Sequence, residues 1–215
     1  MDFEQLLKQR YTTKHYDNTR KVPDETITKI LECVRLTPTS VNAQPYHFYV
    51  LTGAAKDSLR PAIMDFNLQR YDGASHAIVI ACKTAIDEEH LAKVLAAEER
   101  DGRLPSAEIK AAQDKSRHYF NNLHVTKGDY TTWTGKQAYS AFATMVYAAE
   151  NYGVDSTALE GIEFDQVDAI MKLADKQETC ALIVVLGYRA ADDSNQLTKR
   201  PKSRLDLADL VTYLN

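Results

Sequence analysis

The sequence has no Gly-x-Gly segment, although eight of its 215 residues are glycine. A Rossmann dinucleotide site needs this pattern, because the backbone there must come close to a pyrophosphate at a helix N-terminus. The pair Gly135-Lys136 matches part of a P-loop, but Gln137 stands where a P-loop has serine or threonine. The glycine pattern therefore argues against both of these nucleotide-binding sites.

Cysteine is also scarce. The three cysteines, Cys33, Cys82 and Cys180, are far apart and include no Cys-x-x-Cys pair, so we expect them to be reduced residues of a cytoplasmic protein. The six histidines include no pair spaced i,i+4, the spacing that puts two metal ligands on one helix face. We therefore expect neither a disulfide framework nor a metal site.

Long hydrophobic runs and an excess of positive charge are absent too. The N-terminus lacks the basic and apolar regions of a secretory signal, and no apolar run is as long as a transmembrane helix. The net charge at pH 7 is -4, which argues against nucleic acid or an anionic membrane as the main partner. We predict a cytoplasmic protein whose partner is a small molecule.

The segments that are present predict one α+β domain over residues 1–215, with a mixed central sheet flanked by helices. Apolar or alternating runs predict strands at residues 46–51, 77–82, 154–159 and 181–187. Helical patterns cover residues 24–37, 53–71 and 164–173, and a long helix is capped by Thr131 or Thr132 and ends at Gly153. Two polar helices over about residues 87–122 form an excursion that could cover a site. Residues 209–214 have strand character with no later strand to pair with.

Two basic clusters, one near each end of the chain, are the strongest chemical signal. The first is Arg10-Tyr11-Thr12-Thr13-Lys14, and residues 199–204 supply the second. Guanidinium, ammonium and hydroxyl groups all suit a phosphate. A solvated helix end is the simpler explanation of the first cluster when it is taken alone. If the two ends meet, the fold closes around a phosphorylated ligand.

Three other polar segments fit either a ligand site or ordinary local structure. They are Thr39, Ser40 and Asn42 in the loop of residues 38–44, Asn67 with Arg70, and Glu160-Gly161. Turns favour short polar side chains, and glycine permits close approach of a backbone. Taken singly, each segment is explained by a turn or a helix end.

Taken together and in this order, five segments resemble the FMN-dependent nitroreductase family over nearly the whole chain. They are residues 10–14, 38–48, 67–76, 159–161 and 201–204. The resemblance is to the branch of oxygen-insensitive NAD(P)H nitroreductases and flavin or dihydropteridine reductases. It implies a nitroreductase-like α+β fold, an obligate homodimer with two sites at its interface, and a C-terminal strand exchanged between subunits.

The resemblance also implies a role for each matching residue. Arg10, Thr12, Lys202 and Arg204 would hold the FMN phosphate, with Tyr11 among the cofactor-binding residues. Lys14, Asn67 and Arg70 would border the flavin ring, and Leu159, Glu160 and Gly161 would face its N5 region. Pro38, Thr39, Ser40 and Asn42 would reach the cofactor from the other subunit.

The sequence departs from the family's usual residues at several of these positions. Tyr11 stands where relatives often carry histidine, Tyr46 where tryptophan is frequent, and Arg70 where a lysine is usual. Thr39 and Val41 replace more polar loop residues. These departures leave the phosphate donors in place and bear on substrate preference.

The implied function is an FMN-dependent oxidoreductase that uses NADH or NADPH. It would reduce a small-molecule electron acceptor, namely nitro compounds, quinones, flavins or pteridines, by two electrons in a ping-pong reaction. Lys14 would stabilise negative charge on the reduced flavin, and Phe120 would cover the substrate, although Phe120 also fits a core aromatic. Two alternatives remain open: a non-catalytic module that binds or stores FMN, and a cofactor-free α+β dimer.

Overall fold

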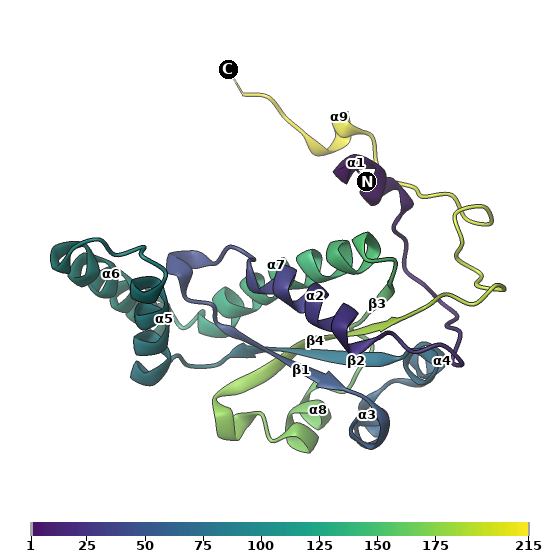
Figure 1. Ribbon diagram of the computed structural model, residues 1–215, viewed down its shortest axis with the longest axis horizontal. Coiled ribbons are helices and arrows are strands. Elements are labelled where there is room, and N and C mark those ends of the chain that lie inside the picture. The colour runs from purple at the N-terminus through teal and green to yellow at the C-terminus, as the bar shows by residue number, and fades with distance from the viewer. Residues whose placement is uncertain (1, 215) are drawn as a thin grey trace.

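A four-stranded sheet lies at the centre of the structure, a computed structural model that describes residues 2–214 (Figure 1). The ends of the expected domain, residues 1 and 215, lie outside the described residues. The strands are β1 (Tyr46–Leu51), β2 (His76–Lys83), β3 (Asp155–Leu159) and β4 (Glu178–Gly187). Their order is β1-β2-β4-β3. All four were expected, each within about three residues of its observed bounds.

The sheet is antiparallel, which corrects the expected mixed sheet. All three strand pairs run antiparallel, and the one parallel contact among the described residues is an isolated bridge between Thr12 and Ser156. Continuous apolar runs such as Ala77 to Cys82 are typical of strands covered on both faces, which is common in parallel sheets. Here helices cover both faces of an antiparallel sheet instead.

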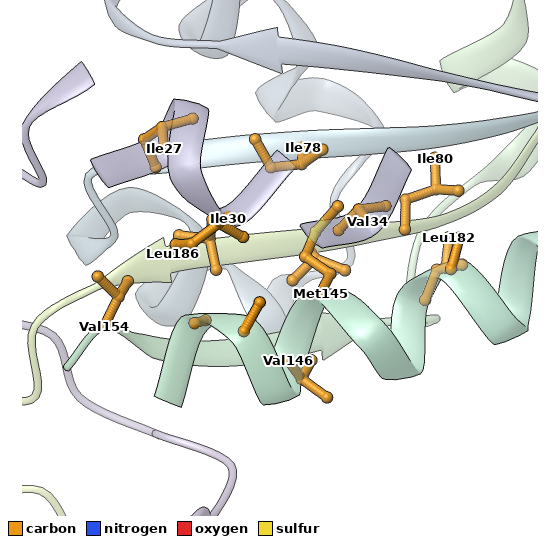
Figure 2. Close-up of a cluster of buried hydrophobic side chains, with 14 of the residues drawn as sticks. Ile27, Ile30, Val34, Ile78, Ile80, Met145, Val146, Val154, Leu182 and Leu186 are labelled. Atoms are coloured by element: carbon orange, nitrogen blue, oxygen red, sulfur yellow. The ribbon is translucent and has the colours of Figure 1, made fainter. Parts of the chain in front are cut away.

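On one face, α2 (Asp24–Arg35) and α7 (Tyr130–Asn151) pack against the sheet. Ile30, Val34, Ile78, Met145 and Leu186 come from α2, β2, α7 and β4 and point toward one another (Figure 2). Met145 is fully buried, and burial of such a side chain stabilises the fold by about 1.5–3 kcal/mol. This layer fixes the long helix across the sheet.

The long helix α7 begins differently from the prediction. Neither Thr131 nor Thr132 caps it, because it begins at Tyr130, after Asp129, and no side chain bonds to its first N–H groups. The expected end is confirmed: Gly153 has φ +70°, a left-handed conformation that glycine adopts without a Cβ clash.

The opposite face is covered by α3 (Gly53–Leu59), α4 (Asp65–Gly73) and α8 (Phe164–Met171). A 3-10 turn, η2 (Arg60–Ala62), separates α3 from α4 and contains Pro61, which explains the expected irregularity. A second 3-10 turn, η3 (Ala174–Lys176), precedes β4.

The two polar helices form an arm at one end of the molecule (Figure 1). They are α5 (Glu88–Arg100) and α6 (Ala107–Lys127), and α6 is five residues longer than predicted. A 3-10 turn, η1 (Ser40–Asn42), contacts α6. Within residues 2–214, no helix has both the length and the apolar character needed to cross a bilayer.

The chain ends lie toward the other end of the molecule from the arm, beyond α7 (Figure 1). They contain α1 (Phe3–Gln9) and α9 (Leu207–Leu210). Within residues 2–214 the tail pairs with no strand: residues 209 and 210 belong to the turn of α9, and residues 211–214 are extended or irregular. The exchange of this tail between subunits stays a prediction.

Glu178 at the start of β4 anchors a buried polar network. Its carboxylate lies 2.8 Å from Lys83 Nζ and 3.3 Å from His47 Nδ1, and it accepts a 2.5 Å bond from Tyr49 Oη. Burial alone raises the pKa of Glu178, but the bonds from His47, Lys83 and Tyr49 outweigh it and lower the pKa to about 2. Because the folded-state pKa is depressed, the stabilisation is present above the ordinary pKa and is lost as pH falls toward 2.

We expect Glu178→Gln to lower the free energy of unfolding at pH 7 by about 1–3 kcal/mol, because it removes the charge from these bonds. The difference from the parent protein should shrink as pH falls below the ordinary value of 4.5, because Glu178 of the unfolded parent chain then binds a proton. Urea unfolding at several pH values measures both effects, with Glu163→Gln, an exposed carboxylate, as the control. A difference that does not vary with pH would contradict this role.

Candidate functional site

The two basic clusters meet in one pocket, which we call the anion pocket. It has a volume of about 210 Å³ and is lined by Arg10, Tyr11, Thr12, Asn195, Leu197, Arg200, Pro201, Lys202, Ser203 and Arg204. The Lys202 ammonium donates to the carbonyls of Leu7 and Arg10, which ties the C-terminal cluster to the end of α1. The prediction that both ends of the chain converge is confirmed.

The cations of the anion pocket repel one another. Burial lowers the pKa of Lys202, and Arg10 and Arg204 lower it further, while Glu150 opposes them. A bound anion would relieve this repulsion, because opposite charge favours the protonated amine. The pocket is therefore suited to a dianionic group such as a phosphate.

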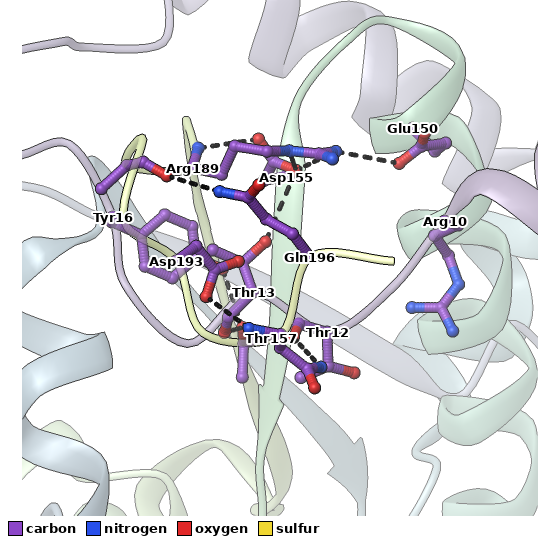
Figure 3. A network of polar contacts seen from close by, with 12 residues as sticks. Arg10, Thr12, Thr13, Tyr16, Glu150, Asp155, Thr157, Arg189, Asp193 and Gln196 are labelled. Atoms are coloured by element: carbon purple, nitrogen blue, oxygen red, sulfur yellow. Dashed lines mark hydrogen bonds and ion pairs between the residues drawn. The ribbon is translucent and has the colours of Figure 1, made fainter. Parts of the chain in front are cut away.

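Asp193 holds the first basic cluster against the loop that follows β4. Its side chain is fully buried, and Oδ1 accepts bonds from the backbone N–H groups of Lys14 at 3.0 Å, His15 at 3.2 Å and Asn195 at 3.3 Å. Asn195 Nδ2 then donates to the carbonyl of Thr12 at 2.7 Å. These bonds hold the backbone of residues 12–15, which borders the anion pocket, against the loop after β4 (Figure 3).

Asp155 and Arg189 form a second support beside the anion pocket (Figure 3). Asp155 accepts from the Arg189 backbone N–H at 2.8 Å and from its Nε at 2.6 Å, and Thr13 Oγ1 donates to it at 3.4 Å. The Arg189 guanidinium lies over the Tyr11 ring, 4.5 Å from its centroid. Buried carboxylates thus offset part of the positive charge at this end of the chain.

Tyr11 is directed into the protein rather than toward solvent. It is 6% exposed, and burial and the nearby Asp193 carboxylate raise the pKa of its hydroxyl. Among the described residues, neither Tyr11 Oη nor Asp193 Oδ2 has a hydrogen-bond partner. The ring of Tyr11 therefore serves mainly as a wall between the anion pocket and Arg189.

Lys14, Asn67, Arg70 and Gly161 make up the other end of the site. Asn67 Nδ2 donates to the Gly161 carbonyl at 3.0 Å, and Arg70 Nη1 donates to Asn67 Oδ1 at 2.7 Å. Arg70 Nε is buried without a partner among the described residues. Burial lowers the pKa of Lys14, and so does Arg70, whereas Asp193 opposes both. This cationic edge has donor capacity left for a ligand.

Residues 159–161 contribute mainly backbone. Leu159 is 1% exposed and belongs to the core, so its side chain does not reach a ligand. At Gly161 an added Cβ would come within 2.4 Å of Phe66 and 2.6 Å of Asn67 Nδ2, so a side chain there would displace both. Glu160 accepts a bond from Tyr139 Oη of α7, and burial together with this carboxylate raises the pKa of Tyr139 to about 12.

The other predicted site residues lie elsewhere in the same chain. Pro38, Thr39, Ser40 and Asn42 belong to the loop beside the α5–α6 arm, and Phe120 is on α6, in edge contact with Tyr119. Figure 1 separates this arm from α1 by the length of α7. The predicted site residues of one chain therefore lie in two separate places.

Comparisons with known proteins identify the family of this chain. The Nitroreductase family matches residues 7–188. The chain belongs to this family. It is 34% identical to the oxygen-insensitive NAD(P)H nitroreductase of Salmonella typhimurium over 99% of both chains. It is 30% identical to the major NAD(P)H-flavin oxidoreductase of Aliivibrio fischeri over 97% of this chain and 96% of that protein.

The fold is shared with solved nitroreductase structures. A protein from Exiguobacterium sibiricum, solved in complex with FMN, superposes with a TM-score of 0.84 at 22% identity. The match covers 100% of this chain and 98% of that one. The predicted nitroreductase-like α+β fold is confirmed.

The sequence analysis did not identify Asp155 and Asp193, the two buried carboxylates that support this site. Asp155 and Asp193 do not touch the anion pocket's opening, and no spacing rule relates them to Arg10 or Lys202. The pair Asp192-Asp193, placed just before the second basic cluster, was the available signal. The role of Asp193 can be recognised only when it is known that the loop after β4 contacts residues 12–15.

We expect Asp193→Ala to speed amide hydrogen exchange at Lys14 and His15 and to lower the free energy of unfolding by about 3 kcal/mol, since three N–H groups lose a charged acceptor. Exchange measured by mass spectrometry on peptides spanning residues 10–16 checks this. Asp192→Ala, which removes an exposed neighbouring carboxylate, is the control. Equal exchange in the two variants would contradict the anchoring role of Asp193.

Proposed function

We propose that the protein binds FMN and reduces small-molecule oxidants with electrons from NADH or NADPH. The observation that carries this proposal is the convergence of Arg10, Thr12, Lys202 and Arg204 in one pocket, in a chain of the Nitroreductase family. Relatives named NAD(P)H nitroreductase and NAD(P)H-flavin oxidoreductase support the same activity. Nitro compounds, quinones, free flavins and pteridines are the oxidants we propose, reduced by a ping-pong mechanism.

The donor groups fit FMN. Arg10, Lys202 and Arg204 would hold the phosphate with charge-assisted bonds, each contributing on the order of 1.5–3 kcal/mol, and Thr12 would add a hydroxyl or backbone donor. Arg70 Nε, which is buried and has no partner among the described residues, suits an acceptor at the edge of a planar ring. When bound, FMN supplies the redox chemistry by taking a hydride from NAD(P)H and passing two electrons to the oxidant.

Lys14 would provide the electrostatic part of the reaction. Its pKa is lowered by burial and by Arg70, so its ammonium gains stability when negative charge appears beside it. A cation fixed in this position favours a reduced, anionic ring over a neutral one. The residue needs no proton transfer to have this effect.

We also propose a homodimer in which the second half-site comes from the partner. In Figure 1 the α5–α6 arm and α1 lie toward opposite ends of α7, so a second copy would complete the half-site of Ser40, Asn42 and Phe120. The tail after Ser203 exposes Leu205, Leu207, Leu210, Tyr213 and Leu214, an apolar series that suits the surface of a second copy. The three cysteines are free, which supports a reducing, cytoplasmic setting.

The visible absorption spectrum of the purified protein is the first test of this function. We expect an oxidised-flavin spectrum, FMN as the pigment released on heating, and bleaching by NADH or NADPH without oxygen. A flavin spectrum without bleaching would favour a storage module. A colourless protein that takes up no added FMN would favour a cofactor-free dimer and contradict the proposal.

We expect Lys14→Ala to lower the reduction potential of bound FMN and to slow its reduction by NAD(P)H, because the variant loses a cation beside the developing charge. Potentials can be measured by anaerobic titration against a reference dye. Lys14→Arg keeps the charge and should keep most of the potential. An unchanged potential in Lys14→Ala would rule out the electrostatic role.

A further inference from the structure

The loop of residues 38–44 has an unusual backbone. Val41 has φ 47°, Asn42 has φ 53° and Gln44 has φ 47°, and none of them is glycine. A β-branched residue such as valine rarely adopts positive φ, because its side chain is strained there. The rest of the structure must therefore hold this loop in place.

Glu98 of α5 and Arg117 of α6 bond to the loop and hold it in this conformation. They are 3% and 1% exposed, and Arg117 Nη2 lies 2.6 Å from Glu98 Oε2. Each partner then makes one further bond to the loop. Arg117 Nε donates to the Val41 carbonyl at 3.1 Å, and Glu98 Oε1 accepts from Asn42 Nδ2 at 2.8 Å.

Two further hydrogen bonds fix the loop on either side of this contact. His90 Nε2 of α5 lies 2.7 Å from the Ala43 carbonyl, and the Ser40 N–H donates to Gln137 Oε1 of α7 at 2.9 Å. The loop is thus bonded to three helices. The charged bonds go to Val41 and Asn42, two of the three residues with positive φ.

A contribution to folding stability does not by itself explain the buried Glu98–Arg117 ion pair. Removing two charges from water costs about as much as their attraction returns, and an apolar pair of similar size often does as well. Arg117 Nη1 is also buried without a partner among the described residues, which adds to the cost. The pair is better explained by the geometry it imposes on the loop.

Arg117 also links the loop to Phe120. The two residues are three apart on α6, so their side chains emerge from the same face of the helix. A displacement of α6 relative to the loop would therefore move both side chains.

We propose that Glu98 and Arg117 are positioning residues, a clamp that holds the loop of residues 38–44 in its binding conformation and sets Phe120 relative to it. This inference rests on the FMN-dependent function proposed above, because that function gives the loop and Phe120 a ligand. The clamp acts through Val41 and Asn42 and touches neither cofactor nor substrate itself.

The test replaces the pair by apolar residues of similar size in the full-length protein. In the double variant Glu98→Leu/Arg117→Met, we expect the melting temperature to change little, because the charges are removed together. Amide exchange in residues 41–44 of the FMN-free protein should rise roughly tenfold for each bond lost, and FMN affinity should fall roughly tenfold.

The matched control is Glu99→Leu/Lys110→Met. Glu99 and Lys110 also pair α5 with α6, at 2.7 Å, but they are partly exposed and make no bond to the loop. The clamp proposal requires this control to match the parent protein in exchange and FMN affinity. Unchanged exchange at residues 41–44 in the Glu98/Arg117 variant would overturn the clamp.

A second variant covers the case in which the apolar pair fails to fold. Arg117→Lys keeps the charge opposite Glu98, but one ammonium cannot reproduce the separate Nε and Nη2 bonds of a guanidinium. We expect faster exchange at residues 42–44, whose N–H groups are hydrogen-bonded within the loop, and weaker FMN binding here as well. Parent-like values of both would overturn the proposal. If the parent protein bound no FMN, the proposed function would fail, while exchange at residues 41–44 would still decide whether the clamp holds the loop.

Discussion

The structure depends on holding two mutually repelling basic clusters together. Arg10 comes from the end of α1 and Lys202 from the C-terminal segment, and burial together with the charge of Arg10 lowers the pKa of Lys202. Buried carboxylates make this possible: Asp193 bonds the backbone around Lys14, and Asp155 pairs with Arg189 behind Tyr11. The cationic lining of the anion pocket is thus held in place by two buried carboxylates, Asp155 and Asp193.

The sheet explains why these distant segments meet. The segment around Thr12 lies along the edge of β3 through its bridge to Ser156, and the loop that carries Asp193 follows directly from β4, the neighbour of β3. Gly187 at the end of β4 lets Tyr16 pass closely, since a Cβ there would come within 2.7 Å of that ring. Two adjacent strands therefore deliver both halves of the anion pocket.

Much of this organisation could be predicted from the sequence, because strong apolar patterns reflect burial directly. β1 was predicted at its observed bounds, and the break at Pro61 followed from the chemistry of proline. Strand direction was not predictable, because a run such as Ala77 to Cys82 reports burial and not pairing. The strand expected at the tail stays a prediction, because its strand character depends on a neighbour from a second copy.

The polar α5–α6 arm shows a further limit of sequence analysis. Glu98 and Arg117 resemble the many exposed charges around them, yet they are among the most buried side chains of the arm. Their burial follows from contact with the loop of residues 38–44, and a contact between distant segments leaves no periodic pattern. The roles proposed for the predicted site residues are supported by the family resemblance together with the anion pocket.

The most direct test of the account compares the affinity of the cofactor-free protein for FMN and for riboflavin, which lacks the phosphate. If the two chain ends form a phosphate site, FMN should bind at least roughly a hundredfold more tightly at low ionic strength, as two charge-assisted bonds would give. Added salt should narrow the difference, because it screens the cations of the anion pocket. Equal affinities for FMN and riboflavin would contradict the account.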